Sequence, residues 1–237
     1  MFLRNLSLFL IVTAATFAAA PATPAAEKAK ANPAFAPATD VPGLPRVLLL
    51  GDSISIGYTV AVREKLAGRA NVHRPPENCG DTARGVASLE KWLGTGRWDI
   101  IHFNFGLHDL KYIDAKNDLA PPHLGKQVAS PETYEKNLRT LVTRLKSTGA
   151  KLVFATTTPV PAGADGRVET DAPRYNAVAM RVMKDMGVAV DDLYAFVVPR
   201  QSEIQRPKNV HFTDAGSAQL ADAVVASLVP LLPSARR

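Results

Sequence analysis

Ser53 is the strongest candidate nucleophile in the sequence. It stands in the segment Gly51-Asp52-Ser53-Ile54-Ser55, directly after the apolar run of residues 47–50. A serine needs a base to take its proton, and the tetrahedral intermediate that it forms on an acyl carbon needs hydrogen-bond donors for its oxyanion. Five histidines are available as the base, namely His73, His102, His108, His123 and His211. The chemistry that this segment indicates is acyl transfer by a serine–histidine pair.

His211 is the histidine whose position best suits a general base. It lies in Asn209-Val210-His211-Phe212-Thr213-Asp214, a loop just ahead of the last expected helix, from which an imidazole can reach back over the ends of buried strands. His102 lies inside an apolar run and is expected to be a hydrogen-bonded core residue. His73 and His123 adjoin proline-rich loops, and we assign no chemistry to them.

The elements that must position these residues alternate between strands and helices. Short apolar runs predict strands at residues 47–50, 70–73, 100–105, 151–155 and 188–190. Helical spacing and end signals predict helices at residues 56–66, 82–93, 131–149, 173–186 and 214–232. This alternation favours right-handed βαβ units, and so predicts a three-layer α/β/α fold around a flavodoxin-like five-stranded parallel sheet.

In an open parallel sheet of this order, ligands bind outside the carboxyl ends of the strands, between the first and the third strand. That rule selects the segments after residues 50 and 105, which are Gly51-Asp52-Ser53 and Gly106-Leu107-His108-Asp109. We therefore expect Ser53 and His108 to lie near one another. Asp52 and Asp109 are expected to accept hydrogen bonds from loop N–H groups rather than to act as acid or base.

Three blocks in order, Gly51-Asp52-Ser53-Ile54, Gly106-Leu107-His108-Asp109 and Val210-His211-Phe212-Thr213, resemble the SGNH (GDSL-type) hydrolases, a resemblance that covers residues 46–233. It implies the SGNH hydrolase fold, with Ser53 as nucleophile and its own N–H as one oxyanion donor. Gly80, in Asn78-Cys79-Gly80-Asp81, matches the glycine that supplies a second donor. The third donor is usually an asparagine, and His108 occupies its place. His211 resembles the general base.

One position departs from the family pattern. The residue three before the histidine is normally an acid that orients the imidazole, and here it is Lys208. We weigh three explanations: a backbone carbonyl orients His211, an acid such as Asp214 or Glu203 does so from elsewhere, or the site is impaired. Asp214 is expected to cap the last helix instead.

Composition excludes several other classes of protein. The chain has 237 residues, 46% of them hydrophobic, and a net charge of +6, which is ordinary for a globular protein. Cys79 is the only cysteine, so no intrachain disulfide forms, and we expect it to be buried. No phosphate-binding loop is present, and the spacing of the histidines and aspartates fits no standard metal site. We therefore expect no cofactor, no metal and no nucleic-acid partner.

The N-terminal residues are predicted to be a targeting signal and not part of the folded domain. A charged start, a short apolar run and small residues indicate a secretory signal peptide over residues 1–20, with an uncleaved anchor as the alternative. Residues 21–45 are rich in alanine and proline and predict a flexible tether, so the domain is expected to span residues 46–237. After cleavage the protein would be secreted or periplasmic, without stable membrane insertion.

The expected function is an exported serine esterase that acts through an acyl-enzyme on a small ester or an acylated glycan, with acetyl or short acyl groups favoured. The long loop of residues 111–130 is placed to shape the substrate pocket. The alternatives are a lysophospholipase or acyltransferase on the same fold, and a non-catalytic carbohydrate-binding relative. The basic charge leaves an acidic glycan open as substrate.

Overall fold

A five-stranded parallel sheet forms the centre of the fold in the computed structural model, which describes residues 32–233. Neighbouring strands follow the order β2-β1-β3-β6-β7, which is the predicted flavodoxin-like order. Their bounds are β1 Arg46–Leu50, β2 Asn71–His73, β3 Ile100–Phe103, β6 Lys151–Ala155 and β7 Ala189–Asp191. The two central strands β1 and β3 are almost wholly buried, because their apolar side chains meet helices on both faces of the sheet.

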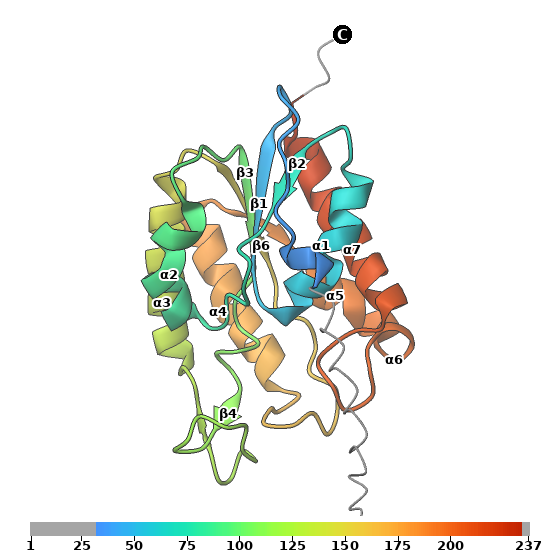
Figure 1. The fold of residues 1–237 in the computed structure, drawn as a ribbon. Coiled ribbons are helices and arrows are strands. Elements are labelled where there is room, and N and C mark those ends of the chain that lie inside the picture. The colour runs from blue at the N-terminus through green and yellow to red at the C-terminus, as the bar shows by residue number, and fades with distance from the viewer. Residues whose placement is uncertain (1–31, 234–237) are drawn as a thin grey trace, which may run out of the picture. The chain divides into compact units, whose positions relative to one another are not determined.

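Helices cover both faces of this sheet, as Figure 1 shows. One layer holds α1 (Ser53–Lys65), α5 (Leu193–Val197) and α7 (Asp214–Leu228). The other holds α2 (Thr82–Leu93), α3 (Pro131–Lys146) and α4 (Asp171–Met186). The three-layer α/β/α prediction is confirmed. No helix within residues 32–233 combines the length and apolar character that crossing a membrane requires.

Side-chain caps set where the helices begin. Asp52 caps α1, Asp81 caps α2 and Ser130 caps α3, each by accepting a hydrogen bond from a main-chain N–H of the first turn. Thr213 caps α7, so the expectation that Asp214 is the cap was wrong by one residue. Helix α1 begins at Ser53, three residues earlier than its apolar spacing indicated, because Asp52 caps it there.

Short elements that the sequence did not indicate lie in the connections. Residues 111–130 contain an antiparallel pair of two-residue strands, β4 (Tyr112–Ile113) and β5 (Lys126–Gln127). The connection from β7 to α7 holds α5, a 3-10 turn at Val198–Arg200 and α6 (Gln201–Ile204). The helical ones among them span little more than one turn and the strands two residues each, which is too short for a helical or an alternating period to show.

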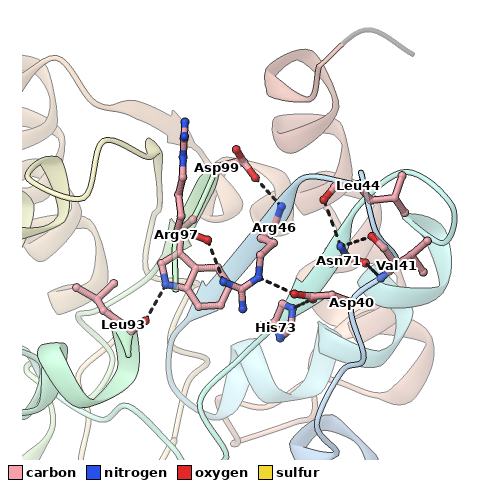
Figure 2. A network of polar contacts seen from close by, with 10 residues as sticks. Asp40, Val41, Leu44, Arg46, Asn71, His73, Leu93, Arg97 and Asp99 are labelled. Atoms are coloured by element: carbon pink, nitrogen blue, oxygen red, sulfur yellow. Dashed lines mark hydrogen bonds and ion pairs between the residues drawn. The ribbon is translucent and has the colours of Figure 1, made fainter. Parts of the chain in front are cut away.

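Residues 32–45 pack onto the domain, which corrects the described part of the expected tether. The carboxylate of Asp40 pairs with Arg46 at 2.9 Å and with His73 at 2.5 Å (Figure 2). The side chain of Asn71 accepts a hydrogen bond from the Val41 N–H and donates to the carbonyl oxygens of Val41 and Leu44. These polar contacts at the start of β1 and β2 hold a segment that apolar periodicity does not mark. The signal segment expected at residues 1–20 and the start of the tether lie outside the described residues.

Candidate active site

Ser53 and His211 meet at the carboxyl end of β1. The Ser53 hydroxyl donates to Nε2 of His211 across 2.8 Å, although 158 positions separate the two residues. Ser53 is the first residue of α1, and His211 lies in the loop before α7, which packs beside α1. The structure thus brings together the two residues that the sequence singled out as nucleophile and base.

Asn209 takes the place of the orienting acid, and sequence reasoning missed it. Its side-chain oxygen Oδ1 lies 2.7 Å from Nδ1 of His211. The same oxygen accepts a hydrogen bond from the backbone N–H of His211 at 2.9 Å. The backbone N–H fixes the amide orientation, because a flipped amide would point its NH₂ group at that N–H. Oδ1 therefore faces Nδ1, which places the imidazole proton on Nδ1 and leaves Nε2 free to take the serine proton.

The other candidates for orienting His211 do not contact its ring. Asp214 lies in the first turn of α7, and Glu203 is exposed on α6. The partner is a side-chain carbonyl two residues before the histidine, and not a backbone carbonyl or a more distant acid. Lys208, three before the histidine, is exposed and adopts a left-handed φ of 53°.

The turn after β1 requires a glycine at position 51. A β-carbon there would collide with the side-chain oxygen of Asn104, which follows β3, and with Ser55. This close approach joins the turn after β1 to the chain leaving β3. The first N–H groups of a helix have no partner within the helix, and that of Ser53 points from the positive end of α1. Its N–H is accordingly suited to the oxyanion role that we expect of it.

Gly80 stands in a loop beside the nucleophile turn, since the Cys79 N–H donates to the carbonyl oxygen of Gly51 at 3.2 Å. Its φ of 67° lies in the left-handed region that glycine favours. The Gly80 N–H donates to Oδ1 of Asn78 at 2.9 Å. For Gly80 to stabilise an oxyanion, this side chain must share or release that N–H. The donor role of Gly80 remains a prediction.

His108 lies in the turn after β3 and forms no side-chain hydrogen bond with any described residue. Burial lowers the pKa of His108, the Asp52 carboxylate opposes that shift, and Lys111 and Arg167 reinforce it. The ring is therefore neutral at pH 7 and has one N–H to donate. This protonation state agrees with the oxyanion role expected from its position in the third block.

Replacing His108 tests that role. His108→Ala is expected to lower kcat for an acetyl ester about 100-fold, as loss of one oxyanion donor does in other enzymes. His108→Asn retains a donor at this position and is expected to keep most of the activity. Steady-state kinetics on 4-nitrophenyl acetate distinguishes the two variants. Equal activity in His108→Ala and His108→Asn would show that this side chain is no oxyanion donor.

Arg74 is a buried brace beneath the nucleophile turn that sequence reasoning did not find. Its guanidinium donates to the carbonyl oxygens of Gly51, at 3.3 Å, and Glu77, at 3.1 Å. It also donates to the hydroxyls of Ser55 and Thr59 on α1. One side chain thus holds the Gly51 turn, the start of α1 and the loop before Gly80 together.

Asp109 likewise links the third block to a neighbouring element, the start of α2. It accepts hydrogen bonds from the N–H and the hydroxyl of Thr82, the first residue of α2, at 3.0 and 2.5 Å. Burial raises the pKa of Asp109 to about 7. Asp52 likewise accepts from the Ile54 N–H. Both aspartates accept hydrogen bonds from main-chain N–H groups as expected, but these groups belong to the first turns of α1 and α2 rather than to loops.

The remaining candidates form no side-chain hydrogen bond with Ser53 or His211. His102 is a core residue as expected, bonded to Asp191 at 3.0 Å. Cys79 is buried, and burial raises the pKa of its thiol to about 11, so it is no reactive thiolate. His73 pairs with Asp40, and His123 is exposed. Among residues 32–233, no three His, Cys, Asp or Glu side chains are grouped closely enough to hold a metal ion.

A cavity of about 520 Å³ opens beside the Ser53–His211 pair. Its volume lies in the range of small-molecule binding sites. Apolar side chains of α1 line it together with polar groups, among them Arg206, Asp214, Ser217, Asn32 and Glu64. Gly80 and His108 are not among its lining residues. The cavity therefore begins on the histidine side of the serine.

Comparison with known proteins agrees with this geometry. The model of the GDSL-like lipase/acylhydrolase family matches residues 49–219, a segment that contains both Ser53 and His211. No curated protein matches the chain. Several solved structures share the fold at low sequence identity.

The shared fold extends over most of this chain and over nearly all of three solved structures. A lipase/acylhydrolase from Enterococcus faecalis superposes with a TM-score of 0.65 at 21% identity, over 82% of this chain and 100% of its own. The acetyl xylan esterase AlAXEase gives 0.63 at 16% identity, over 77% and 99%. The acetylxylan esterase Axe2 from Geobacillus stearothermophilus gives 0.61 at 17%, over 78% and 94%. The chain belongs to the GDSL-like lipase/acylhydrolase family and is a hydrolase of ester bonds.

Proposed function

We propose that the chain is an exported serine esterase that removes acetyl or other short acyl groups from a carbohydrate. The observation that carries the mechanism is the 2.8 Å hydrogen bond from Ser53 to a His211 whose Nδ1 is held by Asn209. Burial lowers the pKa of His211, with the Arg167 and Arg206 guanidinium groups adding to the shift and Asp52 opposing it. The imidazole is therefore neutral at pH 7 and able to act as a base.

In the first half of the reaction, Ser53 Oγ attacks the ester carbonyl while its proton passes to Nε2 of His211. The Ser53 N–H, with His108 and Gly80, stabilises the oxyanion. The resulting imidazolium gives its proton to the leaving alkoxide, and the alcohol departs. In the second half, His211 takes a proton from water, which attacks the acyl-enzyme. Collapse of that intermediate releases the acid and restores the Ser53 hydroxyl.

The cavity supports a sugar as the alcohol part of the ester. The leaving oxygen must lie near His211 Nε2, and the cavity begins on that side of Ser53. Its lining mixes apolar side chains with amide, hydroxyl and charged groups. Such a lining suits a hydroxyl-bearing ring better than a long acyl chain. The solved acetylxylan esterases with the same fold act on acetylated sugars, which is consistent with this proposal.

A series of 4-nitrophenyl esters from acetate to decanoate tests the acyl preference. We expect kcat/KM to be highest for acetate or propionate and to fall with longer chains. Acetate release from acetylated xylan is measured beside it. A maximum at octanoate or decanoate, with no release of acetate from the glycan, would favour the lysophospholipase alternative.

Export rests on the charged start and apolar run of residues 1–20. The proposed export is tested by expressing the full chain in a secreting bacterial host and sequencing the N-terminus of the exported protein. A protein that keeps Met1 and stays in the cell would contradict it.

A further inference from the structure

Arg167 is a partly buried arginine whose guanidinium forms no ion pair with an acid in the described part of the chain. It lies in the connection between β6 and α4. Nε donates to the carbonyl oxygen of Leu107 at 3.2 Å, and Nη1 donates to that of Asp165 at 3.3 Å. Nη2 has no acceptor among residues 32–233, and the side chain forms no ion pair with a carboxylate of that part of the chain. A partly buried cation in this state has hydrogen bonds left to give to an anion.

Arg167 and its loop contact residues on either side of His108 in the sequence. Leu107, whose oxygen it contacts, directly precedes His108 in the third block. The neighbouring Gly166 accepts a hydrogen bond from the Tyr112 N–H at 2.7 Å, which joins the Arg167 loop to the long loop after the third block. The charge of Arg167 lowers the pKa of both His108 and His211. Arg167 therefore lies close enough to the site for its charge to act on both His108 and His211.

The acids around Arg167 and Lys111 form no ion pair with either cation, although Oδ2 of Asp52 has no hydrogen-bond partner among the described residues. Asp52, which is fully buried, accepts the Ile54 N–H and makes no hydrogen bond to Arg167. Asp81 caps α2, and Asp109 is bonded to Thr82. Lys111, partly buried on the same side, adds a second cation that forms no ion pair with a described residue. The charge of Asp52 partly offsets the effect of burial on the pKa of Arg167, but Arg167 and Lys111 form no ion pair with a described acid.

We propose that Arg167 binds a carboxylate of the substrate, and that the glycan hydrolysed by this enzyme carries uronic acid residues. This inference rests on the proposed function and narrows its substrate class. The edge formed by Nη1 and Nη2 can donate two parallel hydrogen bonds to the two oxygens of a planar carboxylate. A neutral sugar leaves that edge unpaired. The enzyme therefore distinguishes acidic from neutral sugars by the charge on the ring substituent.

Binding is measured first, because it does not depend on turnover. In a Ser53→Ala background, methyl glucuronoside and its uncharged carboxamide are titrated by calorimetry. We expect the acid to bind about 10-fold more tightly, as a charge-assisted hydrogen bond allows. Arg167→Met should abolish the difference, and Arg167→Lys should keep part of it. Arg69 serves as the control, since its exposed side chain forms no hydrogen bond or ion pair with a described residue and Arg69→Met removes the same charge. Equal binding of acid and carboxamide by the Arg167-containing protein would overturn the inference.

Turnover gives the second readout. The ratio of kcat/KM for the O-acetylated methyl glucuronoside to that for its carboxamide is expected to exceed 10 in the natural enzyme and to approach 1 in Arg167→Met. A purely structural role for Arg167 lowers both rates together and leaves the ratio unchanged, which would overturn the inference. If neither ester is hydrolysed faster than by Ser53→Ala, the proposed function fails. In that case the comparison of acid and carboxamide binding still tests whether Arg167 binds a carboxylate.

Discussion

Replacing Ser53 with alanine is expected to lower kcat/KM for 4-nitrophenyl acetate by about 10,000-fold or more, since no other group can form the acyl-enzyme. The Ser53 hydroxyl is the one that contacts His211 Nε2. The side chain is small and lies at the first position of α1, so its loss leaves the Asp52 cap intact. The variant should therefore unfold at nearly the same temperature as the natural protein. Steady-state kinetics together with thermal unfolding checks both parts.

A double variant sharpens this test. Residues that act as one unit have non-additive effects, so Ser53→Ala combined with His211→Ala should be no slower than Ser53→Ala alone. Ser147→Ala is the matched control, because Ser147 is exposed at the end of α3, and it should keep full activity. A fluorophosphonate is expected to add one mass increment to the natural protein and none to Ser53→Ala. Labelling of Ser53→Ala at an equal rate would place the nucleophile elsewhere.

The sheet and its helices were predictable because their residues carry strong local signals. Strands β1 and β3 are continuous apolar runs, and α3 begins at a serine–proline pair that both caps and starts a helix. The strand order then placed Ser53 and His108 at one edge of the sheet by a rule of topology. Residues 32–45 were not predictable, since single polar contacts such as that of Asp40 with His73 leave no periodic pattern.

The hydrogen bonds that hold the loops of the site together could not be predicted from the sequence for a similar reason. Arg74 donates to three carbonyl oxygens and two hydroxyls, as any arginine near a turn can, and nothing in the neighbouring sequence marks it as buried. The hydrogen bond from the Gly80 N–H to Asn78 depends on one side-chain rotamer. Block motifs report which residue types are present, whereas these contacts depend on how the loops fold.

The loop before His211 shows why the missing acid does not leave the histidine without a partner. The chain turns back on itself there, with the Arg206 N–H bonded to the His211 carbonyl oxygen at 2.9 Å and the Asn209 N–H bonded to that of Arg206 at 3.2 Å. Lys208 takes the left-handed conformation within this turn and remains exposed. In this geometry the side chain two positions before the histidine reaches Nδ1.

Asn209→Ala is accordingly expected to lower kcat about 100-fold, because the imidazole loses the acceptor that fixes its tautomer and orientation. The effect should be smaller than that of His211→Ala, which removes the base and should approach the effect of Ser53→Ala. Lys208→Ala is the control: its side chain does not contact the ring, and kcat should stay unchanged. Equal kcat in Asn209→Ala and the natural enzyme would remove Asn209 from the mechanism.

Asn209→Asp separates the charge of the partner from its geometry. A base works only when deprotonated, so activity falls as the pH drops through the pKa of His211, which burial keeps below its usual value near 6.5. An aspartate at position 209 keeps an oxygen facing Nδ1 and adds a negative charge that stabilises the imidazolium. The acidic limb of the profile of kcat/KM against pH should therefore move to higher pH in Asn209→Asp. It should not move upward in this way in Asn209→Ala, where no charge is added. An acidic limb at the same pH in the natural enzyme and in Asn209→Asp would mean that residue 209 does not contact the ring during catalysis, since a carboxylate hydrogen-bonded to the imidazole cannot leave its pKa unchanged.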